Sequence, residues 1–268
     1  MTWIALGLLA GLVLGTYDFL TKLALKEKTV LAAVFWCSVL GALIWLPFFY
    51  APMSWSATLR EVGLAPERLS SEQQMALLPK SVMMVATWIL SYYSVKSLPL
   101  SISAGVRASG PLWTALGAVL LLSESLSWWQ WLGLAVSMGS YYLFSLIGRK
   151  EGISFRRNLW VLCMLAATLL SSANALYDKY ILATLHMDLA AVQAYSAVQR
   201  GGIALLLLPW DTHAIGGPAL FGLAYVSLFS MLIGFIFWYR GLALGGVAAV
   251  GQLQLLQPFF GLALAGLL

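Results

Sequence analysis

Three ionisable side chains lie deep inside long apolar segments, where a charge needs a partner or a function. They are Asp18, Arg107 and Arg200. A charge at the centre of a lipid bilayer costs about 2.5–3.5 kcal/mol on insertion scales. An arginine in that position is suited to binding an anion, because its guanidinium group meets a carboxylate or a phosphate with two parallel hydrogen bonds. These residue types predict ligand-binding chemistry at Arg107 and Arg200.

Arg107 lies in a polar stripe. Ser103, Arg107, Gly110 and Thr114 follow helical spacing and share one face. Pro111 lacks an amide hydrogen, which leaves the carbonyl of Arg107 without its helical donor and predicts a kink beside the arginine. We expect Arg107 and Ser103 to contact the acidic group of a substrate. A structural partner for Arg107, either a carboxylate or helix carbonyls, is an equally good explanation.

A second polar stripe contains Arg200. Gln193, Ser196 and Arg200 fall on one helical face, and Gly201 and Gly202 would allow another helix to approach closely. Arg200 is a candidate for lining a cavity. The alternatives are an interhelical pair and a helix register that places Arg200 nearer the membrane interface.

Further candidate binding residues lie toward the carboxyl end of the chain and among the aromatic residues. Gln254 and Gln257 are one turn apart before Pro258. They could form hydrogen bonds to a polar ligand or, equally, to a neighbouring helix. The aromatic candidates for a cavity wall, each of which could instead be a packing residue, are Tyr92, Trp113, Trp238 and Tyr239.

Two polar pairs at matching positions suggest a coupling site. Asp18 and Lys22 are one turn apart and could satisfy each other within their helix. Asn174 and Asp178 repeat this arrangement 156 residues later. We expect these four residues to take part in coupling, with Asp18 as the group that exchanges a proton.

The composition indicates that these residues are carried by membrane-spanning helices. Apolar residues make up 61% of the chain and charged residues 9%, and the mean hydropathy is +0.88. A soluble domain has about 25% charged residues. Apolar runs near 20 residues are long enough to cross a hydrocarbon core of about 30 Å. The sequence predicts an all-α polytopic membrane protein with nine spans, at residues 3–25, 29–50, 80–97, 100–123, 128–148, 158–182, 189–209, 218–240 and 246–268.

Other classes of protein fit the sequence poorly. The net charge of +5 comes mainly from basic residues at span ends, which does not indicate a nucleic-acid partner. Cys37 and Cys163 both fall in apolar spans, and neither they nor the two histidines have metal-ligand spacing. No nucleophile lies near a base in the pattern of a hydrolase. We therefore expect no enzyme activity, no metal and no cofactor.

Two connections stand out. Residues 51–79 form a polar stretch, in which the segment from Ser71 to Gln74 is either a short interfacial helix or part of a loop. The basic connection between Gly148 and Asn158 is the natural boundary between two halves, 1–150 and 151–268.

An internal repeat relates the two halves. Tyr92 and Pro111 are 19 residues apart, and Tyr239 and Pro258 have the same separation. Membrane transporters are commonly built from two such halves around a substrate site at the midplane.

These segments resemble a known family. One runs from Pro111 through the Ser-Glu-Ser-Leu-Ser-Trp-Trp-Gln stretch at 123–130 to Gly133, and the other is Trp-Tyr-Arg-Gly-Leu-Ala at 238–243 followed by Pro258. They are similar to the EamA-type repeat of the drug/metabolite transporter superfamily. The resemblance implies two inverted five-helix repeats, cytoplasmic termini and a central cavity for small metabolites.

The sequence departs from that pattern in two ways. Glu124 follows Pro111 by 13 residues and another helix comes next, so the same spacing from Pro258 places a tenth helix beyond Leu268. We therefore expect the tenth helix to be missing and the chain to be a truncated form. The loop charges favour the orientation opposite to the family's. Basic residues on the amino-terminal side are Arg60, Arg68, Lys80, Lys179 and Arg240, and those on the other side are Lys26, Lys28, Lys96, Arg149, Lys150, Arg156 and Arg157.

The function that the resemblance and the polar residues predict is secondary transport. We expect a permease or exporter in the bacterial cytoplasmic membrane that moves a small organic metabolite by alternating access. The substrate would carry an anionic group, such as an amino acid or a related carboxylate, and protons are a candidate coupling ion. A structural or truncated helical bundle that transports nothing is the alternative.

Overall fold

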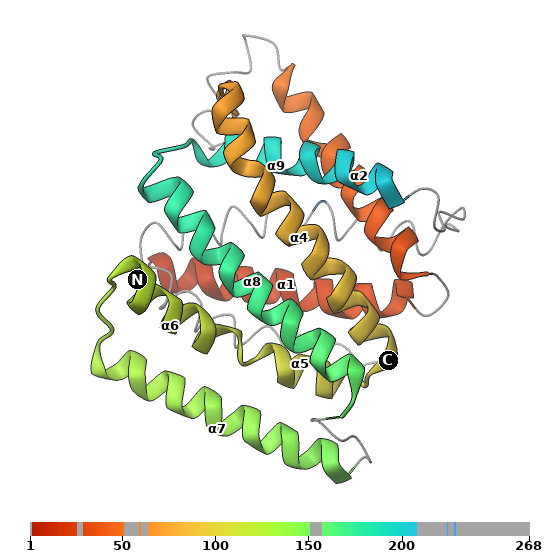
Figure 1. The fold of residues 1–268 in the computed structure, drawn as a ribbon, viewed down its shortest axis with the longest axis vertical. Helices are drawn as coiled ribbons and strands as arrows, with labels where there is room; N and C mark the ends of the chain where they lie inside the picture. Colours follow the sequence, from red (N-terminus) through yellow and green to blue (C-terminus); the bar gives the residue numbers. More distant parts are fainter. Residues whose placement is uncertain are drawn as a thin grey trace.

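The regular structure of the described residues is helical. A computed structural model of the chain describes residues 2–25, 29–50, 59, 64–150, 157–207, 224 and 228. In these residues no strand occurs, and the elements are α1 (Thr2–Leu25), α2 (Val30–Phe49), α4 (Ser71–Ser97), α5 (Leu100–Arg107), α6 (Gly110–Leu122), α7 (Trp128–Lys150), α8 (Leu159–Ala183), α9 (Leu189–Ala204) and the 3₁₀ turn η1 (Leu205–Leu207) (Figure 1). The predicted spans at 218–240 and 246–268 lie outside the described residues.

Several helices are suited to crossing a bilayer. In the described part of the chain, four segments are long and apolar enough, namely Val30–Phe49, Ser71–Ser97, Ile102–Leu122 and Leu159–Ala183. The prediction of a polytopic helical protein agrees with them. The predicted count of nine spans and the inverted repeat stay predictions.

The start of α4 differs from the sequence prediction. The helix was expected to begin at residue 80, yet it begins at Ser71 because Ser70 and Gln73 form a capping box. The backbone N–H of Gln73 donates to the Ser70 hydroxyl at 3.2 Å, and the backbone N–H of Ser70 donates to the side-chain oxygen Oε1 of Gln73 at 2.9 Å. The helix continues through Pro79, which is exposed on the surface of the bundle. The polar stretch predicted at 51–79 therefore included residues 71–79, which belong to α4.

At the position of the predicted kink beside Arg107, a short turn at Ala108 and Ser109 separates two helices, and both residues keep helical backbone angles. Instead of one helix over 100–123, α5 ends at Arg107 and α6 begins at Gly110. Pro111 occupies the first turn of α6, where its missing amide hydrogen costs nothing. The Ser109 hydroxyl donates to the Val106 carbonyl at 2.8 Å across the turn. The turn interrupts the helix next to the arginine but leaves Ile102–Leu122 as one apolar segment.

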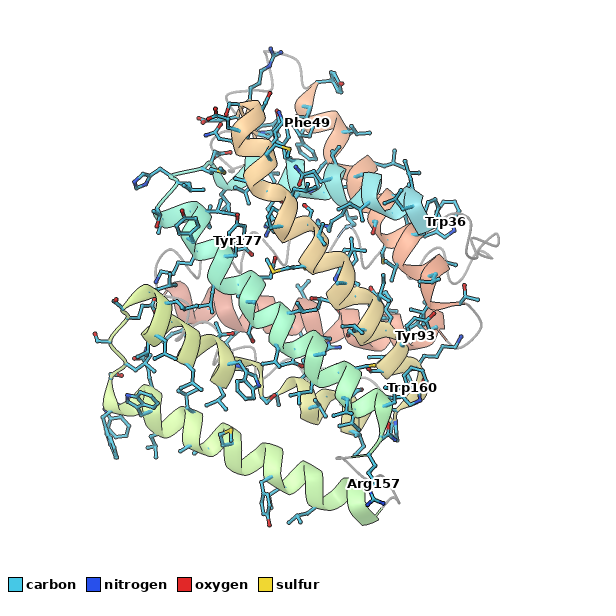
Figure 2. The ribbon with its side chains drawn as sticks, in the orientation of Figure 1. Trp36, Phe49, Tyr93, Arg157, Trp160 and Tyr177 are labelled. Atoms are coloured by element: carbon cyan, nitrogen blue, oxygen red, sulfur yellow. The ribbon has the colours of Figure 1, made fainter. Side chains whose placement is uncertain are left out.

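Helix α4 runs through the middle of the bundle beside α8, with which it has its most extensive contacts. The two helices are antiparallel. At one end the Tyr177 hydroxyl donates to the Ala76 carbonyl at 2.8 Å. At the other end the Ser94 hydroxyl donates to the Trp160 carbonyl at 2.8 Å, and the rings of Tyr93 and Trp160 stack with centroids 6.1 Å apart (Figure 2). Polar contacts thus fasten the α4–α8 pair at both ends.

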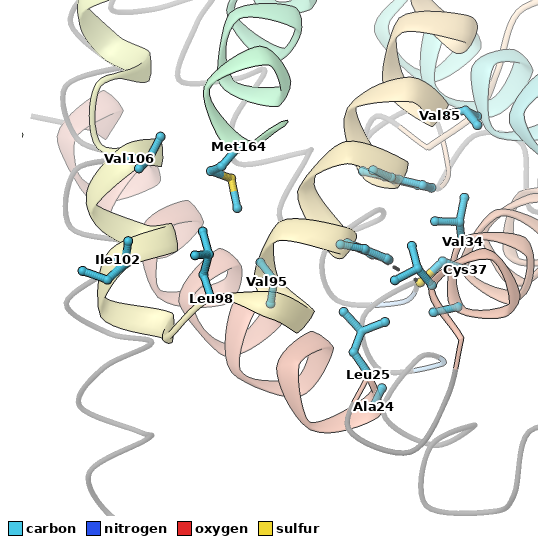
Figure 3. Packing of buried hydrophobic residues seen from close by; sticks show 14 of the residues in the cluster. Ala24, Leu25, Val34, Cys37, Val85, Val95, Leu98, Ile102, Val106 and Met164 are labelled. Carbon is cyan, nitrogen blue, oxygen red and sulfur yellow. Dashed lines mark hydrogen bonds between the residues drawn. The ribbon is translucent and has the colours of Figure 1, made fainter. Parts of the chain in front are cut away.

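The remaining described helices pack on this pair. Helices α2 and α9 lie together near one end of the bundle, while α5, α6 and α7 occupy the other (Figure 1). The main buried cluster includes Leu25, Val34, Cys37, Val95 and Met164, contributed by α1, α2, α4 and α8 (Figure 3). Because lipid is as apolar as these side chains, close packing rather than exclusion of water holds such helices together.

Candidate functional site

Two arginines from different parts of the chain reach the same face of α4. The guanidinium carbon of Arg200, on α9, lies 5.5 Å from the ring centroid of Trp88. The Arg107 side chain, at the end of α5, donates through Nη2 to the Ser91 hydroxyl at 3.0 Å. Trp88 and Ser91 are one helical turn apart and therefore neighbours on α4. Arg200 is 1% exposed, and Arg107 is half-buried. The structure brings the two predicted anion-binding residues to one level of the bundle.

Two more predicted residues lie near this level. Tyr92 is buried one turn from Trp88, and its hydroxyl is 3.8 Å from the Cys37 sulfur of α2. Ser103 is buried on α5, one turn before Arg107. Trp113 is different, because it lies on α6 beyond the helix break, where its indole nitrogen donates to the Ser109 hydroxyl at 3.2 Å. Trp113 therefore supports the break and is separated from the arginines by it.

The polar face predicted for α9 is buried. Gln193, Ser196 and Arg200 are 4%, 0% and 1% exposed. The neighbouring Gln199 faces α4, where it accepts from the Ser81 hydroxyl at 2.8 Å and donates to the Gln74 carbonyl at 2.7 Å. These two bonds fix the rotation of α9 about its axis, so that Gln199 and Arg200 both contact α4, at Ser81 and at Trp88.

A buried ion pair that was not predicted joins α4 to α8. Lys80 and Asp178 form a salt bridge with side chains 0% and 3% exposed. The second oxygen of Asp178 accepts from the Asn174 amide at 3.3 Å. Lys80 was expected at the first residue of its helix and was counted among the loop charges. It lies inside α4 instead, because the helix already starts at Ser71. The capping box is the signal in the sequence that could have placed Lys80 inside the helix.

The pairs expected to couple transport have separate surroundings. Asn174 and Asp178 contact each other and Lys80. Lys22 reaches the end of the neighbouring helix, where it donates to the carbonyls of Val95 and of Leu98, the latter at 2.8 Å. The sequence suggested that Lys22 could pair with Asp18 within its own helix. In the structure Lys22 also has carbonyl acceptors on a neighbouring helix.

Four predicted binding residues and one predicted coupling side chain lie outside the described residues. The binding residues are Trp238, Tyr239, Gln254 and Gln257, and the side chain is that of Asp18. Within the described ranges, no three His, Cys, Asp or Glu side chains come close enough to hold a metal ion.

Comparison with known proteins gives the family of the chain. The model of the EamA-like transporter family matches residues 1–146 and 158–268, which is nearly the whole sequence. The chain belongs to the EamA-like transporter family. The resemblance of its repeat segments to that family is thereby confirmed, and family membership together with the apolar helices makes it a multi-pass membrane protein. Membership points to a transporter rather than an enzyme.

A curated relative carries a matching description. The chain is 70% identical over 66 residues to a protein of Bacillus subtilis (strain 168) described as "Uncharacterized transporter YdeK". The match covers 25% of this chain and 23% of that protein. The chain thus matches about a quarter of the length of this relative.

Proposed function

We propose that this protein is a secondary transporter that carries a small organic metabolite with an anionic group, by alternating access. One observation carries the proposal: Arg107 and Arg200 come from helices nearly a hundred residues apart and reach adjacent turns of α4. Guanidinium groups keep their charge in an apolar site and pair with carboxylates through two hydrogen bonds. The substrate class that these groups favour is an amino acid or a related carboxylate.

The arrangement of α4 and α8 supports alternating access. Polar contacts hold the pair together at both ends, with Tyr177 and Lys80–Asp178 toward one end and Ser94 with Trp160 at the other. In the proposed cycle these ends separate in turn, while the arginines between them retain the substrate. The turn after Arg107 interrupts the helix beside the site, and interrupted helices commonly line transport cavities.

Coupling to protons is part of the proposal. Asp18 is the proposed proton-exchanging group, with Lys22, Asn174 and Asp178 as the polar partners at matching positions of the two halves. An Asp18→Asn variant should lose the dependence of transport on a pH gradient. Proton-driven accumulation that persists in this variant would remove Asp18 from the mechanism.

The proposed architecture has inverted halves, residues 1–150 and 151–268. Single cysteines at positions 71 and 214, in a background without Cys37 and Cys163, should then react with a membrane-impermeant reagent from opposite sides. Labelling of both positions from one side would contradict the inverted arrangement.

The anion site can be tested by flux measurements in proteoliposomes with a panel of radiolabelled carboxylates. Arg107→Gln and Arg200→Gln should each weaken the affinity for the transported acid roughly 10- to 100-fold, because a hydrogen bond to a charged group contributes about 1.5–3 kcal/mol. Arg157→Gln is the matched control, since Arg157 is exposed before α8 (Figure 2). Folded Arg107 and Arg200 variants with unchanged affinity would refute the assignment. The absence of saturable uptake of any acid by the parent protein would favour the non-transporting bundle.

A further inference from the structure

The buried face of α9 holds hydrogen-bonding groups without partners. The Gln193 side-chain nitrogen and the Ser196 hydroxyl are both buried, and neither has a hydrogen-bond partner among the described residues. Buried polar groups in proteins are nearly always paired, so each exception requires an explanation. Gln199, on the same helix, differs from Gln193. Both the oxygen and the nitrogen of its side-chain amide form hydrogen bonds to α4.

The positions of these groups relate them to the proposed anion site. Gln193, Ser196 and Arg200 occupy successive turns of one helical face, with axial rises of about 4.5 Å and 6 Å between them. Arg200 lies against the ring of Trp88, which bounds this end of the row. A molecule whose carboxylate is held at Arg200 can therefore extend along α9 past Ser196 toward Gln193.

We propose that this face of α9 binds the oxygen atoms of a hydroxylated organic acid whose carboxylate is held at Arg200. The inference rests on the proposed function, and it names the kind of substrate that this site takes. An amide nitrogen can only donate a hydrogen bond, so the Gln193 nitrogen is satisfied by an oxygen acceptor. A methylene chain would leave it unpaired, and an ammonium group would place donor against donor. The Ser196 hydroxyl can donate to one ligand oxygen or accept from its hydrogen.

Three six-carbon acids separate these possibilities in one assay. Gluconate carries hydroxyl groups along its chain, hexanoate carries methylene groups, and 6-aminohexanoate adds an ammonium group at the end of the chain away from the carboxylate. A ligand that binds the folded protein raises its unfolding temperature according to its concentration and Kd. In thermal unfolding of the purified full chain in detergent, gluconate should bind roughly tenfold or more tightly than hexanoate and 6-aminohexanoate, because a site built to bond hydroxyl groups rejects an analogue that lacks them.

Variants of the two groups without partners give a second, independent readout. Ser196→Ala and Gln193→Leu should abolish the preference for gluconate over hexanoate. Their unfolding temperatures without ligand should be equal to or above that of the parent, since each removes a buried polar group that has no partner. Gln199→Leu is the matched control, which should lower the unfolding temperature and keep the preference for gluconate.

The outcomes distinguish this inference from the function on which it rests. Equal stabilisation by all three acids would overturn the hydroxylated substrate and leave the arginine site intact. Gluconate binding that is unchanged in Arg200→Gln would overturn the proposed anion site itself. No stabilisation by gluconate also overturns the inference. If Ser196→Ala and Gln193→Leu lose stability without ligand and keep the preference for gluconate, the two groups hold ordered water and the inference is wrong.

Discussion

Removing the carboxylate of Asp178 should destabilise the protein more than removing its partner. Three charged groups interact here, since Asp178 pairs with Lys80 and the positive charge of Arg200 acts on the Lys80 ammonium. Asp178→Asn leaves two buried cations that repel each other without the anion. Lys80→Met leaves one cation and one anion, which still attract. The arrangement therefore predicts an asymmetry between two changes at the same salt bridge.

The expected size follows from the burial of the pair. Both side chains are at most 3% exposed, so bulk solvent does not compensate a charge that loses its partner. Removing one member of a buried pair typically costs about 3–5 kcal/mol. The Asp178→Asn change also weakens the bond from Asn174, which now meets a neutral group. We expect a cost at the upper end of this range for Asp178→Asn and at or below its lower end for Lys80→Met.

Thermal unfolding in detergent measures this difference. At roughly 2–4 °C per kcal/mol for a chain of this size, Asp178→Asn should unfold about 10–20 °C below the parent. The double variant Lys80→Met with Asp178→Leu should recover most of the loss, because apolar replacement of a buried pair is often neutral or stabilising. Equal losses for the two single variants, or a double variant as unstable as Asp178→Asn, would refute the account of three interacting charges.

Four further substitutions test the packing and the ends of the helices. A Cβ atom at Gly201 would lie 2.9 Å from the Ala42 Cβ of α2, so Gly201→Ala should cost about 1–3 kcal/mol in the unfolding free energy. Gly202→Ala meets nothing within 4 Å and should be neutral or stabilising, and a loss as large as that at Gly201 would show that packing is not the cause. Ser70→Ala removes the capping box of α4 and should cost about 1 kcal/mol, whereas an unchanged unfolding temperature would contradict its role. Lys22→Met should increase hydrogen exchange at the end of α4, because it removes the donor to two terminal carbonyls there; unchanged exchange would exclude this link between helices.

Most of the described helices could be predicted from the sequence, because apolar runs are long and their limits carry strong local signals. Helix α7 was expected at 128–148 and forms over Trp128–Lys150, and α8 was expected at 158–182 and forms over Leu159–Ala183. The error at α4 has a physical cause. Pro79 and Lys80 are typical of a helix start, yet a proline on an exposed face is tolerated and the lysine is satisfied by a distant carboxylate.

The candidate site was predictable in its residues and not in its contacts. Helical spacing correctly grouped Gln193, Ser196 and Arg200, since a shared face is a local property of one helix. Spacing says nothing about which helices become neighbours. The positions of Arg107 on Ser91 and of Arg200 on Trp88 depend on the packing of α5 and α9 against α4, which is set by contacts distant in the sequence.

The salt bridge between Lys80 and Asp178 has a consequence for biosynthesis. Lys80 is made 98 residues before its partner, which at about 5–20 residues per second is a delay of roughly 5–20 s. During that time α4 can be inserted while its lysine still lacks a counter-charge. With 27 residues, α4 is about 40 Å long, whereas the hydrocarbon core is about 30 Å thick. The extra length allows the nascent helix to sit with Lys80 in the headgroup region until α8 arrives. The ion pair can form only when α8 has been made, so α4 reaches its final contacts only after part of the second half of the chain has been synthesised.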